Sequence, residues 1–142
     1  MNSIKIIIAI LSFGLFSCQG QETGKVEQLD AKTFSEKITS SNDIQLLDVR
    51  TPGEFQDQHI DHATNINWNG ANFEKEVAVL DKSKPVYIYC KSGGRSNQAA
   101  HKLAEMGYTK IYELNGGMMK WNAAGLSEKS NKTIGMTKED FN

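Results

Sequence analysis

The chain has 142 residues, 39% of them hydrophobic, and a formal net charge of −1 at neutral pH, which suits one globular domain of ordinary size. No basic stripe and no interleaving of aromatic with basic residues occurs along the sequence, so composition and charge argue against a nucleic-acid partner.

Residues 1–17 are predicted to form a signal peptide. Lys5 supplies a positive charge, and the apolar run at residues 6–16 is shorter than the roughly 20 residues that a membrane-spanning helix needs. The run ends just before Cys18 in a pattern that resembles a bacterial lipobox. This resemblance implies a lipid on Cys18 that anchors the protein in the cell envelope, at the outer membrane facing the periplasm. An ordinary signal peptide cut nearby would instead give a soluble periplasmic protein. Residues 18–25 are small and polar and are expected to be a tether.

The two cysteines of the sequence, Cys18 and Cys90, admit two interpretations. An exported protein permits a disulfide between them. Lipidation of Cys18 would instead leave Cys90 as a lone thiol, and a lone thiol in an exported protein marks a candidate reactive site. We favour the second interpretation.

Strands and helices are predicted to alternate along the rest of the chain, with Asp30 as a candidate N-cap of the first helix. Strands are expected at residues 26–29, 44–49, 63–67, 86–89 and 110–114, and helices at 31–39, from 52, at 73–80, from 96 up to Gly107 and from 116 up to Gly125. This alternation predicts an α/β domain at residues 26–127, in which helices cover both faces of a parallel sheet. Residues 128–142 are expected to form a polar, poorly ordered tail.

The most informative stretch of the sequence is residues 86–96. Cys90 follows a buried strand and precedes a polar, glycine-containing loop and the start of a helix. The unpaired amides and positive dipole of a helix N-terminus, together with Lys91 and Arg95, favour a thiolate, which is the nucleophilic form of cysteine. The same amides would hold an anionic substrate. A buried structural cysteine is the alternative, but such a residue needs no polar, cationic loop after it.

Four stretches of the sequence form a recognisable set. They are residues 46–55 (LLDVRTPGEF), His59–Ile60 with residues 63–66, residues 89–96 (YCKSGGRS), and residues 114–117 (LNGG) with Trp121 and residues 124–126. Together they resemble the single-domain rhodaneses, which are sulfurtransferases. The resemblance covers about residues 26–126 and implies a rhodanese-like α/β fold with a central five-stranded parallel sheet, flanked by helices on both faces.

The resemblance also implies a chemistry for the cysteine loop. Cys90 would carry sulfane sulfur as a persulfide from a small donor such as thiosulfate to a thiophilic acceptor, a thiol or a protein, without a cofactor. The substrate-binding loop would consist of Lys91, Ser92, Gly93, Gly94, Arg95 and Ser96. Its Cys-x4-Arg spacing is one residue shorter than the Cys-x5-Arg loop of related phosphatases and arsenate reductases, which disfavours phosphate-ester hydrolysis. The alternative role is a persulfide carrier or a non-turnover binding module at the envelope.

Other residues near these motifs are expected to support the site. Asp48 would stabilise the strand end beside the loop, and Arg50 is predicted to pair with Glu54. Arg95 either binds the anionic donor or holds the loop by hydrogen bonds, and its planar guanidinium suits both roles. Trp121 is expected in the core. The three histidines lack ligand spacing, so no metal site is predicted.

Overall fold

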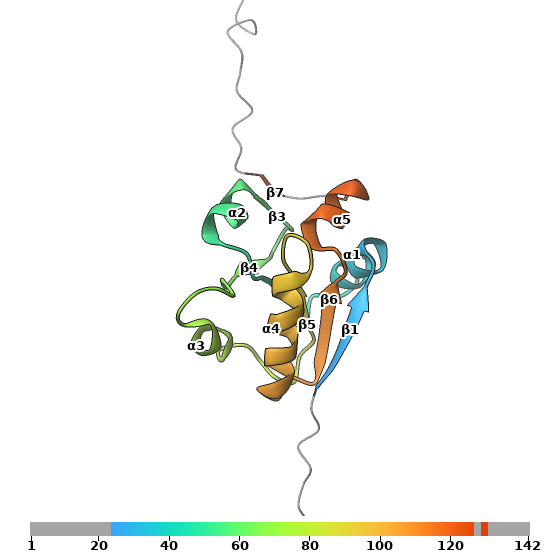
Figure 1. Cartoon of the computed structure of the whole chain (residues 1–142). Helices are drawn as coiled ribbons and strands as arrows, with labels where there is room; N and C mark the ends of the chain where they lie inside the picture. The colour runs from blue at the N-terminus through green and yellow to red at the C-terminus, as the bar shows by residue number, and fades with distance from the viewer. Residues whose placement is uncertain (1–23, 127–128, 131–142) are drawn as a thin grey trace, which may run out of the picture.

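A parallel five-stranded sheet forms the centre of the protein, which confirms the predicted fold class (Figure 1). The computed structural model describes residues 24–126 and 129–130. The strands run in the order β1 (Lys25–Leu29), β6 (Lys110–Leu114), β5 (Val86–Tyr89), β2 (Gln45–Asp48) and β4 (Thr64–Asn65). The strand that leads to Cys90, β5, is the middle one and pairs with β6 on one side and β2 on the other.

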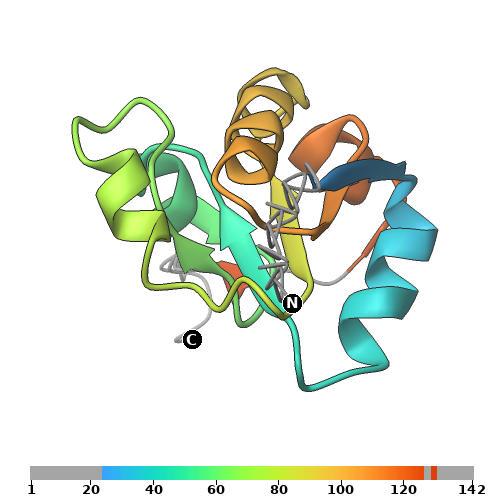
Figure 2. The same cartoon turned by 90° about the horizontal axis from the view of Figure 1, so that it is seen from below.

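Helices cover both faces of this sheet. They are α1 (Ala31–Thr39), α2 (Pro52–Asp57), α3 (Phe73–Val77), α4 (Gly94–Glu105) and α5 (Gly117–Ala123). Figure 2 shows α4 and α1 on opposite sides of the sheet. On one side α3 and α4 contribute Phe73 and Leu103 to a hydrophobic core, and on the other side α1 and α5 contribute Phe34 and Trp121 to a second core. Trp121 is therefore a core residue, as expected.

The alternation of side chains along β5 divides these two cores. Val86, Ile88 and Cys90 belong to the core under α4, whereas Tyr87 and Tyr89 belong to the core under α1 and α5. Successive side chains of a strand point to opposite faces of the sheet, and this period-2 pattern directs Cys90 toward the face that α4 covers. The catalytic candidate thus lies between the end of β5 and the start of α4.

Several element boundaries differ from the predictions. α4 begins at Gly94, two residues earlier than expected, and the strand predicted at residues 63–67 is reduced to the two residues of β4. The segment predicted as a tail contains β7 (Lys129–Ser130), which pairs antiparallel with β3 (Gln58–His59). Two residues of the predicted tail, Lys129 and Ser130, therefore belong to a strand. The N-cap prediction is confirmed, because the Asp30 side chain accepts a hydrogen bond from the Thr33 amide.

The signal peptide, the lipidated Cys18 and most of the tether lie outside the described residues and stay predictions. Within residues 24–126 and 129–130, no helix combines the length and the apolar character that crossing a bilayer requires.

The first turn of α5 packs against the end of β5. The Met118 amide donates a hydrogen bond to the Cys90 carbonyl oxygen at 2.9 Å. The Met119 amide donates to the Lys91 carbonyl oxygen at 3.0 Å. Gly117 opens the helix with a φ of +56°, and a Cβ atom at this position would collide with the Cys90 carbonyl oxygen. Only glycine therefore allows α5 to approach the loop so closely.

Replacing Gly117 with Ala is expected to destabilise the protein by about 1–3 kcal/mol, because the new methyl group would strain the backbone and clash with the Cys90 carbonyl oxygen. Gly53→Ala is the matched control, since Gly53 lies in α2 and nothing outside its own helix backbone lies within 4 Å of its Cβ position. Guanidinium denaturation of both variants measures the free energy of unfolding. Equal losses in the two variants, or no loss at position 117, would show that the approach of α5 is not constrained in this way.

Candidate active site

Cys90 follows β5 directly, at the edge of the sheet where parallel-sheet proteins bind ligands. The residue is only 1% exposed and carries a free thiol. The Gly93 amide donates a hydrogen bond to the Cys90 Sγ atom at 3.1 Å. Gly93 has a φ of +103°, which glycine adopts without strain, and this conformation turns the chain back toward the sulfur before α4 begins.

The hydrogen bonds that the Met118 and Met119 amides of α5 donate to the loop set the orientation of the loop amides. In a planar trans peptide, the carbonyl oxygen and the next amide hydrogen lie on opposite sides of the chain. The described residues contain no cis peptide bond. Because the carbonyl groups of Cys90 and Lys91 point at α5, the amides of Lys91 and Ser92 point away from it. The Ser92 amide is one of the groups that interact with Cys90. The helix thus turns hydrogen-bond donors, rather than acceptors, toward the sulfur.

Two opposing effects act on the acidity of the thiol. Burial raises the pKa of Cys90, but the donors around it outweigh that effect and leave the pKa below its ordinary value. These donors are the Ser96 hydroxyl and the amides of Ser96, Ser92 and Gly93. Ser96 lies in the first turn of α4, where amides have no partner within the helix. A lowered pKa enlarges the thiolate fraction near neutral pH, so the arrangement fits a nucleophilic cysteine better than an inert one.

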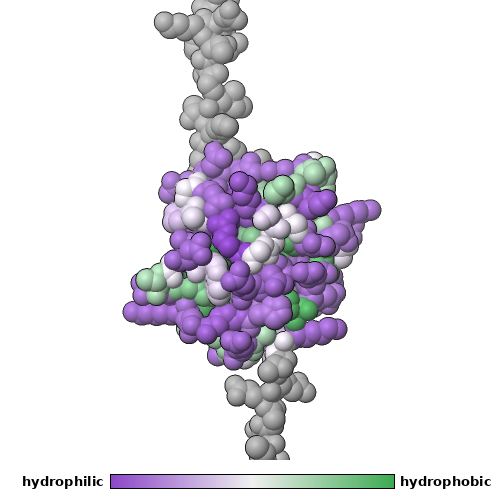
Figure 3. All heavy atoms as spheres, viewed as in Figure 1, coloured by the Kyte–Doolittle hydropathy of each residue, from purple (hydrophilic) through white to green (hydrophobic). Residues whose placement is uncertain are grey.

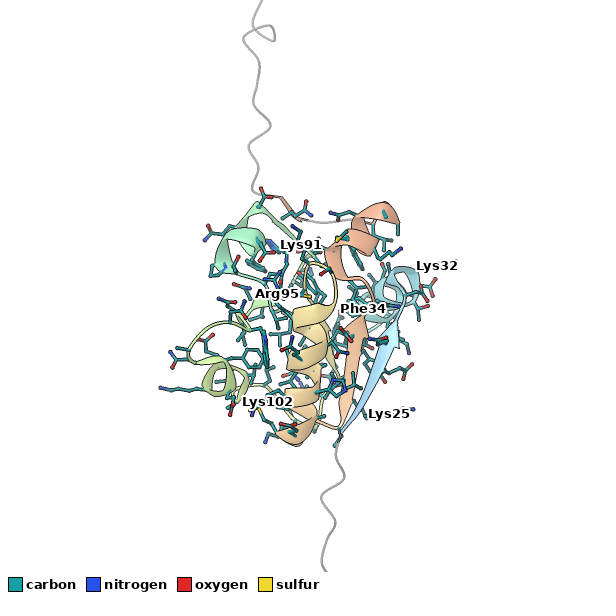
Figure 4. All side chains as sticks on the ribbon, viewed as in Figure 1. Lys25, Lys32, Phe34, Lys91, Arg95 and Lys102 are labelled. Atoms are coloured by element: carbon teal, nitrogen blue, oxygen red, sulfur yellow. The ribbon has the colours of Figure 1, made fainter. Side chains whose placement is uncertain are left out.

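Arg95 is held by Glu54 of α2. Its Nη1 and Nη2 atoms donate to the two carboxylate oxygens of Glu54, each at 2.8 Å. Glu54 also accepts a hydrogen bond from the Thr51 amide at 3.0 Å and completes the cap of α2. Figure 4 shows Arg95 at the start of α4, with Lys91 beyond it at the same end of the molecule. Of the two roles that the sequence left open for Arg95, the structure favours holding the loop.

The prediction that Arg50 pairs with Glu54 is wrong. Arg50 instead binds Asp48, with 2.6 Å between Nη2 and Oδ2, and both side chains are buried. The two residues are two positions apart on extended chain, which brings their side chains to the same side. Arg50 also donates to the Gln58 carbonyl oxygen at 2.6 Å and lies over the Tyr89 ring. This buried pair therefore braces the segment that follows β2 against the end of β5.

The exposed residues of the cysteine loop are Lys91, Ser92 and Gly94. The face of the molecule seen in Figure 3 is mostly hydrophilic, with apolar residues only in small groups.

A hollow of about 790 Å³ has Leu46 and Trp121 in its wall, and no residue of the loop lines it. Among the described residues, no group of acidic, histidine or cysteine side chains could hold a metal ion.

Three residues that shape the site were not assigned these roles from the sequence. Glu54 holds Arg95, Gly117 admits α5, and the buried Glu113 of β6 accepts a hydrogen bond from Ser96 Oγ at 2.8 Å. The Thr-x-x-Glu pattern at Thr51 signals a helix cap and could have directed Glu54 toward α2 rather than Arg50. No local pattern marks Glu113, because it stands in a strand and its partners lie far along the chain.

The Glu54–Arg95 pair is expected to make stability depend on pH. The hydrogen bonds from Arg95 lower the pKa of Glu54 from 4.5 to about 2, against the opposing effect of burial. A carboxylate with a depressed folded-state pKa stabilises the fold above its unfolded-state pKa, and this contribution is lost as the pH falls from 4.5 toward about 2. Near neutral pH, Glu54→Gln should cost about 1–2 kcal/mol, because the pair is partly exposed to screening water.

Urea denaturation of the wild type and of Glu54→Gln across the acidic range measures this difference, which should shrink as the pH falls. Glu105→Gln is the control, since Glu105 is exposed and lies 4.0 Å from Lys102. A gap between wild type and Glu54→Gln that stays constant down to the acid limit would contradict the role of the pair.

Comparison with known proteins identifies the family of this chain. The family described as Rhodanese-like domain matches residues 30–124. A sulfurtransferase of Allochromatium vinosum is 32% identical over 101 residues, which cover 71% of this chain and 92% of the relative. The thiosulfate sulfurtransferase GlpE of Shewanella oneidensis is 32% identical over 88 residues, which cover 62% of this chain and 85% of the relative.

A solved structure of a sulfur transferase has a similar fold. The solution structure of the polysulfide-sulfur transferase homodimer of Wolinella succinogenes superposes with a TM-score of 0.67 and is 30% identical, covering 78% of this chain and 82% of that chain. The family match extends over more than half of the sequence and includes the cysteine loop and every helix of the described domain. The chain therefore belongs to the rhodanese-like family, and the relatives named here are described as sulfur transferases.

Proposed function

We propose that this protein is a thiosulfate sulfurtransferase-like enzyme that carries sulfane sulfur on Cys90 as a persulfide. The observation that carries the proposal is the hydrogen bond from the Gly93 amide to Cys90 Sγ, within a set of donors that lower the pKa of the thiol. A cysteine so placed is a nucleophile at the end of a central strand, and relatives similar in sequence to this chain are named sulfurtransferases.

The reaction consists of two displacements at sulfur. The Cys90 thiolate attacks the outer sulfur of a donor such as thiosulfate, a new sulfur–sulfur bond forms at Cys90, and sulfite leaves with the electron pair of the broken bond. A thiophilic acceptor then attacks the outer sulfur of the persulfide, and Cys90 leaves as a thiolate. Splitting one transfer into two steps through a covalent intermediate is the advantage of nucleophilic catalysis.

The loop geometry favours both steps for the same reason. Each step begins or ends with negative charge on Cys90 Sγ, and the amides of Ser92 and Gly93 are already turned toward that atom. Donors fixed in advance stabilise a developing charge without reorganisation during the reaction. Because the Cys90 side chain is only 1% exposed, only the terminal sulfur of the donor, and not the rest of the donor molecule, would contact Sγ. In the loop after Cys90, Lys91 is exposed and would attract an anionic donor, whereas Arg95 is bound to Glu54. Sequence alone supports the further proposal that a lipid on Cys18 holds this enzyme at the cell envelope.

Treating the purified chain with thiosulfate should add one sulfur, about 32 Da, to the peptide that contains Cys90. Cys90→Ser should lose this adduct and lower steady-state sulfur transfer to cyanide at least about 10³-fold, because the nucleophile is gone. Cys18→Ser is the matched control, since it removes the other cysteine of the chain and should keep the adduct. Intact and peptide mass spectrometry, with an assay of thiocyanate formation, give the two readouts.

The outcomes separate the proposal from its alternative. Sulfur transfer that survives in Cys90→Ser, or an adduct that stays on the chain in that variant, would refute the mechanism. A wild-type chain that takes up one sulfur but does not turn over would instead be a persulfide carrier.

A further inference from the structure

One large apolar side chain is exposed beside the cysteine loop. Among the described residues, the exposed large hydrophobic side chains are Val79 and Met119, and Met119 is 59% exposed. Its apolar neighbours in α5, Met118 and Trp121, are buried in the core. The Met119 amide donates to the Lys91 carbonyl oxygen at 3.0 Å, so this side chain begins at the contact that holds the loop. A single exposed apolar side chain is ordinary, and its meaning depends on what surrounds it.

Two lysines flank Met119. Lys91 and Lys120 are both exposed, and within the described part of the chain neither forms an ion pair. The Cγ atom of Lys120 would collide with a Cβ atom at Gly116, and the Gly116 nitrogen is in turn 3.6 Å from the Cβ position of Gly93 in the loop. Lys91, Met119 and Lys120 therefore form one patch beside the cysteine loop, which we call the loop rim.

The loop rim is positively charged, although the formal net charge of the whole chain is only −1. Residues 91–96 and 114–126, the segments that form it, contain three cations and no acid. Of the acids whose side chains hydrogen-bond to these segments, Glu54 is bound by Arg95, and Glu113 lies buried below the loop. The exposed lysines of the rim are therefore not neutralised by these acids. A local excess of positive charge attracts an anionic partner.

The surface around the loop, rather than a cavity, is where an acceptor would be held. Three hollows in the described domain, of about 790, 370 and 400 Å³, have no residue of the 91–96 loop in their walls. Cys90 itself is only 1% exposed and offers little contact area. Binding to an open surface needs the area of a protein partner, and methionine is enriched in such interfaces, where an apolar core is surrounded by polar groups. The loop rim has this composition.

We propose that the loop rim is the docking surface for a protein acceptor whose cysteine is flanked by acidic residues and by an apolar side chain. The inference rests on the proposed function in one respect, that Cys90 delivers its sulfur to a thiol. The apolar side chain would cover Met119, and the acidic residues would lie against Lys91 and Lys120. The acceptor thiolate then attacks the outer sulfur of the Cys90 persulfide. A sulfur–sulfur bond forms on the acceptor, and Cys90 leaves with the electron pair of the broken bond.

A peptide probe tests the docking without any sulfur transfer. The acidic peptide carries serine in place of the acceptor cysteine, with a leucine and two glutamates on either side, and it is added to the nitrogen-15-labelled full chain in an NMR titration. The amide resonances of Lys91, Met119 and Lys120 should shift together and give one dissociation constant. A peptide with lysines in place of the glutamates should bind at least about 10-fold more weakly, and high salt should reduce this difference because it screens exposed charges.

Matched variants distinguish the loop rim from the rest of the surface. Met119→Gln keeps the backbone amide that holds the loop and removes only the apolar group, so it should weaken binding of the acidic peptide about five-fold. Lys120→Glu should weaken it about 10-fold and strengthen binding of the lysine peptide. Val79→Gln and Lys110→Glu are the controls, and each should change the dissociation constants less than about two-fold. Val79 is 83% exposed and follows α3, which lies apart from α5 (Figures 1 and 2), and Lys110 begins β6 at the sheet edge opposite the loop.

Equal affinity for the acidic and the lysine peptide, or equal effects of Met119→Gln and Val79→Gln, would overturn the docking surface. Resonance shifts centred on the hollow beside Trp121 instead of on the loop rim would do the same. Because the titration needs no sulfur donor, a chain that takes up no sulfur would refute the proposed function and still report on the docking.

A second measurement follows the sulfur itself. The chain with a Cys90 persulfide should transfer sulfur to the cysteine form of the acidic peptide faster than to that of the lysine peptide, once each rate is divided by the rate of the same peptide with a small disulfide. The division removes the difference in intrinsic reactivity between the two thiols. Equal corrected rates would contradict the proposed acidic acceptor.

Discussion

The site depends on the way the first turn of α5 binds the backbone that follows β5. The amides of Met118 and Met119 take up the carbonyl oxygens of Cys90 and Lys91, and peptide planarity then turns the next amides away from α5. Gly117 makes the close approach feasible, and Gly93 turns the chain back so that its own amide reaches Sγ. An ordinary buried thiol thereby gains the surroundings of an anion-binding site.

The acidic residues around the loop are all paired or hydrogen-bonded, so they do not oppose the stabilisation of the Cys90 thiolate by the loop amides. An unpaired carboxylate near the sulfur would disfavour the thiolate and repel an anionic donor. Asp48 is bound by Arg50, and Glu54 is bound by Arg95. No lysine or arginine among residues 24–126 forms an ion pair with Glu113, but three donors from β1 and α4 hydrogen-bond to it. The Glu54–Arg95 pair joins α2 to α4, Arg50 joins the end of β2 to Gln58 of β3, and the Glu113 cluster joins β6 to β1 and α4. The groups that control the charge of the site are therefore those that fix its geometry.

The part of this arrangement that the sequence could predict is the part encoded locally. The apolar run of β5, the polar glycine loop and the helix after it predicted that Cys90 lies between a strand and a helix, because each signal lies within a few residues of the next. The predicted partner of Arg50 was wrong, because the fold decides which of two nearby acids, Asp48 or Glu54, lies beside the guanidinium group. Glu113 stayed unnoticed because its partner Gln28 is 85 positions away and Ser96 is 17 positions away. A charged residue in a short strand otherwise suggests an exposed position.

The central claim is that the loop amides donate to the Cys90 sulfur and favour its anionic form, and NMR of the Gly93 amide tests it most directly. In a pH titration of nitrogen-15-labelled protein, the Gly93 amide proton should shift downfield in one step. The midpoint should lie below the ordinary cysteine pKa of about 8.5, and the step should be absent in Cys90→Ser. A Gly93 resonance that does not respond to the ionisation of Cys90, or a midpoint above the ordinary value, would contradict the account.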